Sequence, residues 1–203
     1  RDIKPGNILL DQNGTTKIGD FGLVTDDVVE GYATGAGYVD HLAPEYYTDR
    51  VCSVRTDLWA LGVTLYRLLH GHEWYQLGPA PRHVVQSGGF ADSLKWLPHI
   101  DKKWRRIIRH LLRDDPKDRP ADARALARLL AEVEPADWTC EIHGNEIVWR
   151  RPAGRRVIEV RQIKTGARKY SWHAESRPVG NGRTRTLGRN HDLNQSQLER
   201  ELR

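Results

Sequence analysis

Apolar residues in the middle of the chain recur at intervals of three and four positions. They are Leu58, Leu61, Leu65, Leu68 and Leu69. This spacing is that of one face of an α-helix, so it predicts an amphipathic helix from about Ser53 to His70. Gly71 follows the last turn and is a suitable helix C-cap.

Two later segments carry the same helical period. The first has its apolar positions at Trp104, Ile107, Ile108, Leu111 and Leu112. The second runs from Ala123 to Val133 and is rich in Ala, Leu and Arg. Both patterns predict helices that bury one face. We therefore expect the first two-thirds of the chain to be mainly helical.

After about residue 135 the pattern changes to short apolar segments separated by glycine-containing turns. The segments are 141–143, 147–149, 157–160 and 170–173, and the turns are 144–145, 152–154 and 165–166. We expect a small β-rich module with a closing helix over 195–202. A polar stretch from about Pro178 to Asn194, between the last apolar segment and this helix, is expected to be disordered.

Near the N-terminus, two short apolar segments flank Asn13-Gly14, which is typical of a tight β-hairpin turn. If these two residues form the whole loop, the numbers of cross-strand partners add up to 27, and Asn7 lies opposite Asp20. Their Cβ atoms would then be roughly 5 Å apart. An amide oxygen and a carboxylate at that distance suit Mg²⁺, which takes oxygen ligands and completes its shell with water and phosphate.

The charge is unevenly distributed along the chain. Residues 136–203 contain 14 Lys and Arg against 8 Asp and Glu, a net charge of +6, whereas the rest has 18 basic and 19 acidic residues. We therefore expect an α+β protein with two domains, 1–135 and 136–203. No apolar run approaches the roughly 20 residues that cross a bilayer. Cys52 and Cys140 fit no CxxC motif, so we expect reduced thiols in a cytoplasmic protein.

Residues 1–7 (RDIKPGN) and 20–22 (DFG) combine an acid beside a lysine with an amide and a second acid, which suits phosphoryl transfer. Three more motifs follow in order at 43–45 (APE), 56–63 (TDLWALGV) and 115–120 (DPKDRP). Together they resemble the C-terminal lobe of a eukaryotic-type Ser/Thr protein kinase. The resemblance covers about two-thirds of the chain and implies a mainly α-helical lobe with a small catalytic-loop hairpin.

The resemblance implies a role for each polar residue near the start of the chain. Asp2 would orient the substrate hydroxyl and accept its proton, and Lys4 would neutralise charge on the transferred phosphoryl group. Asn7 and Asp20 would hold magnesium. The implied reaction is phosphoryl transfer from ATP with Mg²⁺ to Ser or Thr hydroxyls of protein substrates.

Two further positions imply control of the site. Arg1 resembles the arginine that binds a phosphate group on the activation segment. Phe21, between Asp20 and Gly22, would pack inward and set whether Asp20 points at the site.

Three positions imply structural roles. Asp57 would receive backbone N–H groups of the catalytic loop and hold Asp2 from behind. Glu45 and Arg119 would form a buried ion pair that fixes positions more than it adds stability.

The activation segment between Gly22 and Ala43 carries hydroxyl groups, of which Thr34 is the best candidate for a regulatory phosphosite. The others are Thr25, Tyr32 and Tyr38. The family commonly has Gly-Thr-x-x-Tyr before Ala-Pro-Glu, but residues 35–43 read GAGYVDHLA. The threonine that supports the substrate hydroxyl is therefore either replaced by Ala36 or displaced to Thr34.

The sequence contains no G-x-G-x-x-G-x-V loop, and no strand lysine for the ATP phosphates. We therefore expect a fragment of a longer kinase that, on its own, binds ATP poorly and turns over negligibly. The alternative function is a kinase-like scaffold that binds partners without catalysis. The residues before Arg1 would distinguish the two.

The function of the basic module over 136–203 stays open. Arginines interleaved with Trp149, Tyr170 and Trp172 suit nucleic acid, through phosphate pairing and stacking. A solvated basic sheet face, or a surface for an acidic protein partner, explains the same residues. Arg155 and Arg156 are the positions whose replacement would separate these cases.

Overall fold

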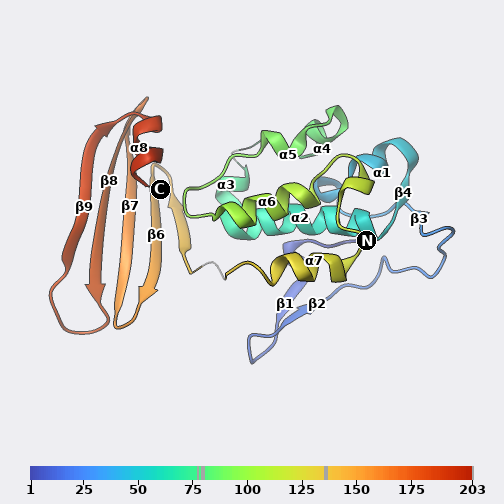
Figure 1. Ribbon diagram of the computed structural model, residues 1–203, viewed down its shortest axis with the longest axis horizontal. Helices are drawn as coiled ribbons and strands as arrows, with labels where there is room; N and C mark the ends of the chain where they lie inside the picture. The colour runs from blue at the N-terminus through green and yellow to red at the C-terminus, as the bar shows by residue number, and fades with distance from the viewer. Residues whose placement is uncertain (77, 79–80, 135–136, 203) are drawn as a thin grey trace. The chain divides into compact units, whose positions relative to one another are not determined.

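A computed structural model describes residues 1–76, 78, 81–134 and 137–202 (Figure 1). Its contacts divide the chain into two compact units. The first comprises 1–96 and 102–134, and the second comprises 97–101 with the described residues from 137 onward. Helices and strands are both well represented, as expected for an α+β protein. The boundary that we expected at Pro135 lies outside the described residues.

The first unit is mainly helical. Its strands are β1 (Ile8–Leu10), β2 (Thr16–Ile18), β3 (Ala33–Thr34) and β4 (Val51–Cys52), paired as β1–β2 and β3–β4. Its helices are α1 (Pro44–Asp49), α2 (Val54–His70), α3 (His72–Gln76), α4 (Pro81–Val84), α5 (Phe90–Ser93), α6 (Lys102–Leu111) and α7 (Ala123–Leu130). Single 3-10 turns lie at Pro5–Asn7, Val39–His41, Val85–Ser87 and Pro116–Asp118.

Helix α2 has the ends that the sequence predicts. The Ser53 hydroxyl accepts a hydrogen bond from the backbone N–H of Arg55, and the Thr56 hydroxyl accepts one from the backbone N–H of Ser53. Gly71 ends the helix at φ +83°, a conformation that favours glycine. The cap groups satisfy backbone donors and acceptors that a helix end leaves open.

The buried face of α2 differs in part from the leucine stripe. Trp59 and Val63 are almost fully buried and belong to a core that includes Ile108 of α6, whereas Leu68 is 56% exposed. Gly62 lies where α6 approaches, because a Cβ there would be 2.9 Å from the Cβ of Leu111. Close packing of α2 on α6 thus depends on glycine at this position.

Glu45 and Arg119 form the buried pair that we expected. The guanidinium of Arg119 donates to both carboxylate oxygens of Glu45 at 2.8 Å, and the two side chains are 0% and 8% exposed. Arg119 also donates to the backbone oxygens of Arg55, Arg113 and Asp114. Every edge of the guanidinium is therefore occupied, and three distant segments are joined.

The catalytic-loop hairpin exists, but the two-residue turn that we expected is wrong. Ile8 pairs with Ile18 and Leu10 with Thr16, so the numbers of cross-strand partners add up to 26. The loop has three residues, and it is closed by the Asp11 carboxylate, which accepts from the backbone N–H groups of Asn13 and Thr15. This carboxylate stabilises a longer turn than the Asn-Gly signal alone predicts.

The second unit is a five-stranded antiparallel sheet in which each strand pairs with the next along the chain. Its strands are β5 (Thr139–His143), β6 (Glu146–Ala153), β7 (Arg156–Gly166), β8 (Lys169–Pro178) and β9 (Arg185–Leu193). Helix α8 (Gln195–Glu201) packs on one face beside β8 and β9 (Figure 1). The β-rich module and its closing helix are confirmed, while the turn expected at Thr165-Gly166 lies instead at Ala167-Arg168.

Strand β9 corrects the expectation of disorder between Pro178 and Asn194. This strand pairs with β8, and Trp172 packs directly on Gly188, where a Cβ would lie 2.7 Å from the indole ring. The Trp172 N–H donates to Glu201 of α8 at 2.6 Å. A polar segment without apolar alternation thus becomes a strand through backbone pairing and one aromatic contact.

The other face of the sheet carries an ion-pair network around Glu159. This carboxylate is 3% exposed and accepts from Arg150 at 2.8 Å and from Arg161 at 2.6 Å, while Arg177 lies 3.3 Å away. Arg150 and Arg161 also pair with the carboxylates of Glu141 and Glu146. Three arginines of this unit, Arg150, Arg161 and Arg177, are therefore neutralised within the sheet.

We predict that Arg119→Ala lowers the free energy of unfolding of the first unit by about 3–5 kcal/mol, because it leaves the Glu45 carboxylate buried without its partner. The matched control is Lys17→Ala, which removes an exposed pair with Asp11 at 3.8 Å and should cost less than about 1 kcal/mol. Urea denaturation of both variants measures the difference. If Arg119→Ala and Lys17→Ala lowered the free energy of unfolding equally, the result would contradict a positional role for the buried pair.

Candidate active site

Three polar side chains of the N-terminal loop converge on one point. The Lys4 ammonium lies 2.6 Å from Oδ2 of Asp2, and the Asn7 side-chain amide donates to the same oxygen at 3.0 Å. Asn7 also donates to the backbone oxygen of Asp2 at 2.9 Å. The other carboxylate oxygen, Oδ1 of Asp2, is buried and has no hydrogen-bond partner among the described residues.

This arrangement fixes the charge state of the pair. Burial alone would raise the pKa of Asp2, but the hydrogen bonds from Lys4 and Asn7 outweigh it, and the pKa lies below its usual value. The hydrogen bond to Asp2 raises the pKa of Lys4, and the nearby Asp20 carboxylate adds to that effect. Asp2 is therefore anionic and Lys4 cationic at neutral pH.

The loop is held in place by its backbone. The Ile3 carbonyl accepts from the Nδ1 of His41 at 2.8 Å and from the Thr64 hydroxyl at 3.3 Å. The backbone nitrogen of Arg1 lies 3.2 Å from the Asp57 carboxylate. Thr64 and Asp57 both belong to α2, so the buried helix carries the loop.

The segment after the hairpin brings Asp20 to the same end of the unit. Gly19 donates to the backbone oxygen of Asn7 at 2.8 Å, so Gly19 faces Asn7 and Asp20 is one residue further along. Asp20 has a φ of +58°, and its Oδ1 accepts from the Gly22 N–H at 3.3 Å. This left-handed conformation is uncommon for a residue other than glycine and directs the carboxylate away from the regular strand path.

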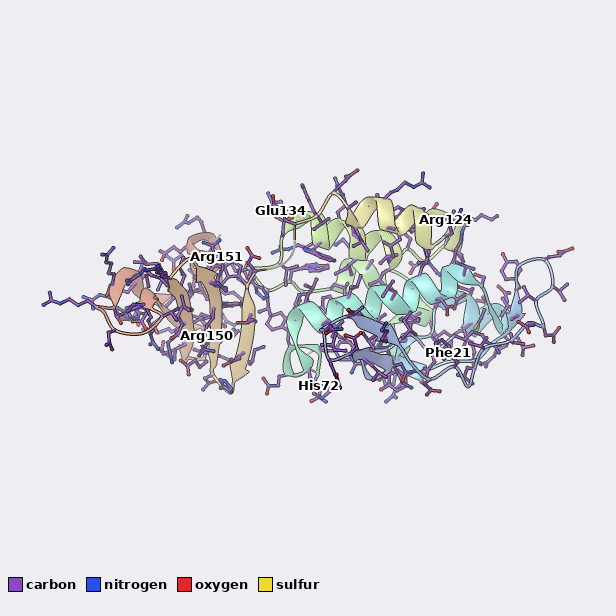
Figure 2. The ribbon with its side chains drawn as sticks, turned by 90° about the horizontal axis from the view of Figure 1, so that it is seen from below. Phe21, His72, Arg124, Glu134, Arg150 and Arg151 are labelled. Atoms are coloured by element: carbon purple, nitrogen blue, oxygen red, sulfur yellow. The ribbon has the colours of Figure 1, made fainter. Side chains whose placement is uncertain are left out.

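Phe21 does not pack inward as we expected. Its side chain is 67% exposed, and Figure 2 shows it at the surface of the first unit. Leu9, Leu10 and Ile18 of the hairpin are more than half exposed as well. The described residues supply no apolar cover for this ring.

Arg1 joins the start of the activation segment to its middle. Its guanidinium donates to the backbone oxygens of Leu23 and Thr34, both at 2.6 Å. Thr34 itself lies in β3, which pairs with β4 next to α2. The expected phosphosite and the expected phosphate-binding arginine are therefore neighbours.

The family comparison decides what this site belongs to. A family model described as the protein kinase domain matches residues 1–130, which is more than half of the chain. The chain belongs to the protein kinase family. All five motifs on which we based the resemblance lie inside the matched region.

Curated relatives of this kinase chain agree with the family assignment. It is 36% identical over 117 residues to an Aurora kinase of Eremothecium gossypii, covering 57% of the chain and 31% of the relative. It is 33% identical over 134 residues to the serine/threonine-protein kinase CHK1 of Saccharomyces cerevisiae, covering 57% and 24%. Protein kinase C eta type of Mus musculus is 40% identical over 74 residues, covering 36% and 11%. The chain thus spans less than a third of the length of these relatives.

The Tyr38 ring of the activation segment lies beside Lys4 of the N-terminal loop. The Lys4 ammonium lies 5.4 Å from the centre of the Tyr38 ring, within cation–π distance. Gly37 makes the approach possible, because a Cβ there would lie 2.6 Å from the backbone oxygen of Arg1. Counting back from Ala43 would have placed Gly37-Tyr38 at the family's Gly-Thr position.

His41 was missed by sequence reasoning. It stands where the family commonly has tyrosine, and no sequence signal indicated its partners. Its Nδ1 bonds to Ile3, and its Nε2 lies 3.0 Å from the Arg67 guanidinium, so the ring is neutral and donates through Nδ1. Burial lowers the pKa of His41 to about 4, and the neighbouring positive charge of Arg67 acts in the same direction.

Two residues that we expected at a nucleic-acid surface, Trp149 and Arg156, are engaged within the second unit. Trp149, proposed for base stacking, is 3% exposed, and Arg156 is engaged with Ser176 and the Arg183 backbone.

Among the described residues, no group of three or more His, Cys, Asp or Glu side chains could hold a metal ion. None of the helices in the described ranges has the length and apolar content needed to span a bilayer.

We predict that the stability of the first unit falls as the pH is lowered from about 6.5 to about 4. In this window the unfolded His41, with a pKa of 6.5, binds a proton that the folded ring does not. The contribution of the neutral His41 ring to the free energy of unfolding is fully present above pH 6.5. It is lost as the pH falls through about 4, by an amount on the order of 3 kcal/mol.

Hydrogen exchange of the α2 amides at pH 7 and pH 4.5 measures this loss. His41→Gln should flatten the pH dependence, because glutamine does not titrate. The control His143→Gln removes an exposed ring of the second unit and should leave the dependence unchanged. A slope that is equal in the wild type and His41→Gln would show that another group titrates.

Proposed function

We propose that this chain is the C-terminal lobe of a Ser/Thr protein kinase, which transfers the terminal phosphoryl group of ATP to Ser or Thr hydroxyls of proteins. One observation carries the proposal: Asp2, Lys4 and Asn7 meet at a carboxylate whose second oxygen is unoccupied. Protein kinase membership and the names of the relatives support it. A lysine two residues after the catalytic aspartate resembles Ser/Thr kinases.

Asp2 is suited to act on the substrate hydroxyl. Its Oδ2 is held by two donors, so the side chain cannot rotate freely, and Oδ1 remains as the acceptor for an incoming O–H. The O–H proton would pass to this oxygen as the substrate oxygen bonds to the terminal phosphorus of ATP and the bond from that phosphorus to the leaving ADP oxygen breaks. A carboxylate with a depressed pKa is a weak base, so its main contribution is orientation of the nucleophile.

The residues present fit magnesium and the ATP phosphates. The Asn7 amide donates through nitrogen, which leaves its oxygen available, and Asp20 uses one carboxylate oxygen weakly for Gly22. Asn7 and Asp20 would hold the ion through oxygen, the ligand atom that Mg²⁺ prefers, and water and phosphate oxygens would supply its other ligands. When bound, the metal would neutralise phosphate charge, and Lys4 would carry the positive charge next to the transferred group.

Thr34 remains our proposed regulatory phosphosite. Its side chain is exposed, and its backbone oxygen already lies 2.6 Å from the Arg1 guanidinium. A phosphate on Thr34 would form a charge-assisted pair with the Arg1 guanidinium. This pair is stronger than the hydrogen bond to the backbone oxygen and would replace it.

We predict that Asp2→Asn reduces phosphoryl transfer by the full-length protein at least about 100-fold, because the amide cannot accept the proton and its N–H₂ group would oppose Lys4. Transfer of labelled phosphate from ATP to a Ser/Thr peptide mixture measures the rate. Asp92→Asn, an exposed change in α5, is the matched control and should keep the wild-type rate.

Two outcomes would contradict the proposal. Equal rates for the wild type and Asp2→Asn would remove Asp2 from the chemistry. No transfer by the full-length wild type under conditions in which it binds ATP would favour the scaffold function instead.

A further inference from the structure

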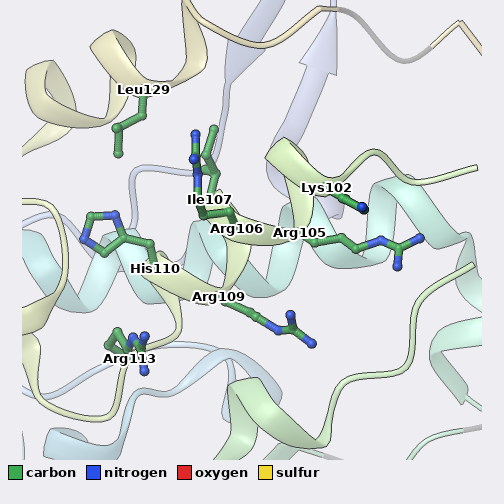
Figure 3. Close-up of a pocket in the computed structure, with 8 residues that line it drawn as sticks. All are labelled: Lys102, Arg105, Arg106, Ile107, Arg109, His110, Arg113 and Leu129. Atoms are coloured by element: carbon green, nitrogen blue, oxygen red, sulfur yellow. The ribbon is translucent and has the colours of Figure 1, made fainter.

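Helix α6 carries a row of positive charge that phosphoryl transfer does not use. From Lys102 to Arg113 the chain has six Lys and Arg, one His and no acidic residue. Six of these side chains line a hollow of about 470 Å³ on the surface of the first unit (Figure 3). They are Lys102, Arg105, Arg106, Arg109, His110 and Arg113. We call this hollow the basic pocket.

The helical period explains why the charges gather. At 100° per residue, the six side chains fall within an arc of about 140°, whereas Ile108 and Leu111 point into the core. Ile107 and, from α7, Leu129 complete the lining (Figure 3). Like charges three and four residues apart destabilise a helix by roughly 0.2–0.5 kcal/mol per pair. The clustered positive charges therefore destabilise α6, and no acidic residue of this helix offsets that effect.

Four basic side chains of the pocket lack an acidic partner in the ranges that the structure describes. Among the described residues, no ion pair involves Lys102, Arg106, Arg109 or Arg113. Arg109 instead lies over the Trp96 ring, with its guanidinium carbon 5.5 Å from the ring centre. An aromatic contact orients a guanidinium without removing its charge. The pocket is therefore preorganised for an anion.

We propose that the basic pocket binds a phosphorylated peptide segment of a partner protein. Four of its six basic residues are arginines, whose planar forks pair with phosphate oxygens two at a time. Lys102 and Arg109 of α6 are about 10 Å apart along the helix axis at 1.5 Å per residue, which an extended peptide spans in about three residues. Ile107 and Leu129 would contact an apolar side chain between two phosphates.

Other polyanions fit this surface less well. Unstacked nucleic acid stacks successive bases on a series of aromatic rings, whereas His110 is the one ring among the residues that line the pocket. A helix that enters the major groove of a duplex must protrude, whereas α7 contributes Leu129 to the same hollow (Figure 3). Membrane-surface helices insert large apolar side chains, but the described exposed apolar residues include none from 102 to 113.

This proposal is independent of catalysis, so it can be tested by binding with the 203-residue chain. The probe is a fluorescein-labelled 12-residue peptide with two phosphoserines three positions apart and a leucine between them. Anisotropy should show saturable binding that weakens at least about tenfold in the double variant Arg106→Ala/Arg109→Ala. Circular dichroism checks that this variant is folded, which we expect because both side chains are exposed.

The matched control is Arg124→Ala/Arg128→Ala, which removes two exposed arginines of α7 that do not line the pocket (Figure 2 labels Arg124). It should change the dissociation constant by less than twofold. Equal weakening by both double variants would mean diffuse electrostatic attraction and would overturn the proposal. So would equal affinity for the unphosphorylated peptide, or for one with glutamate in place of phosphoserine.

Two competing anions complete the test. A 20-nucleotide single strand and vesicles with 20% phosphatidylserine are titrated under the same conditions. Tighter binding of either one than of the phosphopeptide, with the same dependence on Arg106 and Arg109, would assign the pocket to that class and overturn the proposal. Weaker binding of both supports a phosphopeptide partner.

Discussion

The Glu45–Arg119 pair is the contact on which the first unit depends most. It joins the end of the activation segment to a turn 74 residues later, and the same guanidinium also holds a backbone oxygen at the start of α2. A buried ion pair contributes little net free energy compared with apolar packing, but it allows only one geometry when all its hydrogen bonds are satisfied. The residues before and after Glu45 are therefore placed within narrow limits.

That placement extends to the catalytic loop. His41 lies four residues before Glu45 and bonds to the Ile3 carbonyl, and Thr64 of α2 reaches the same oxygen. Asp2 and Lys4 flank Ile3, so the loop inherits its position from the buried helix. The polar chemistry at the surface is rigid because its backbone is hydrogen-bonded to buried groups, which is what preorganisation requires.

Sequence reasoning worked where a pattern had one structural solution. The helical period and capping residues gave α2, and paired motifs gave Glu45 with Arg119. It failed where several solutions compete. A three-residue hairpin loop replaced the Asn-Gly turn because Asp11 happened to cap it, and β9 formed because a neighbouring strand offered backbone partners. The position of Tyr38 follows from counting back from Ala43, but its contact with Lys4 is visible only in the structure.

Charge shows most clearly why composition does not predict function. The net charge of +6 over 136–203 directed attention to the sheet, but there Glu159 gathers three arginines, and several of them bind further carboxylates. The first unit is nearly neutral in total, yet Lys102, Arg106, Arg109 and Arg113 of the basic pocket form no ion pair within the described part of the chain. An anion responds to the local excess of charge within about one Debye length, roughly 8–10 Å, and not to the sum over a domain. The total charge of a unit therefore does not show where an anion would bind.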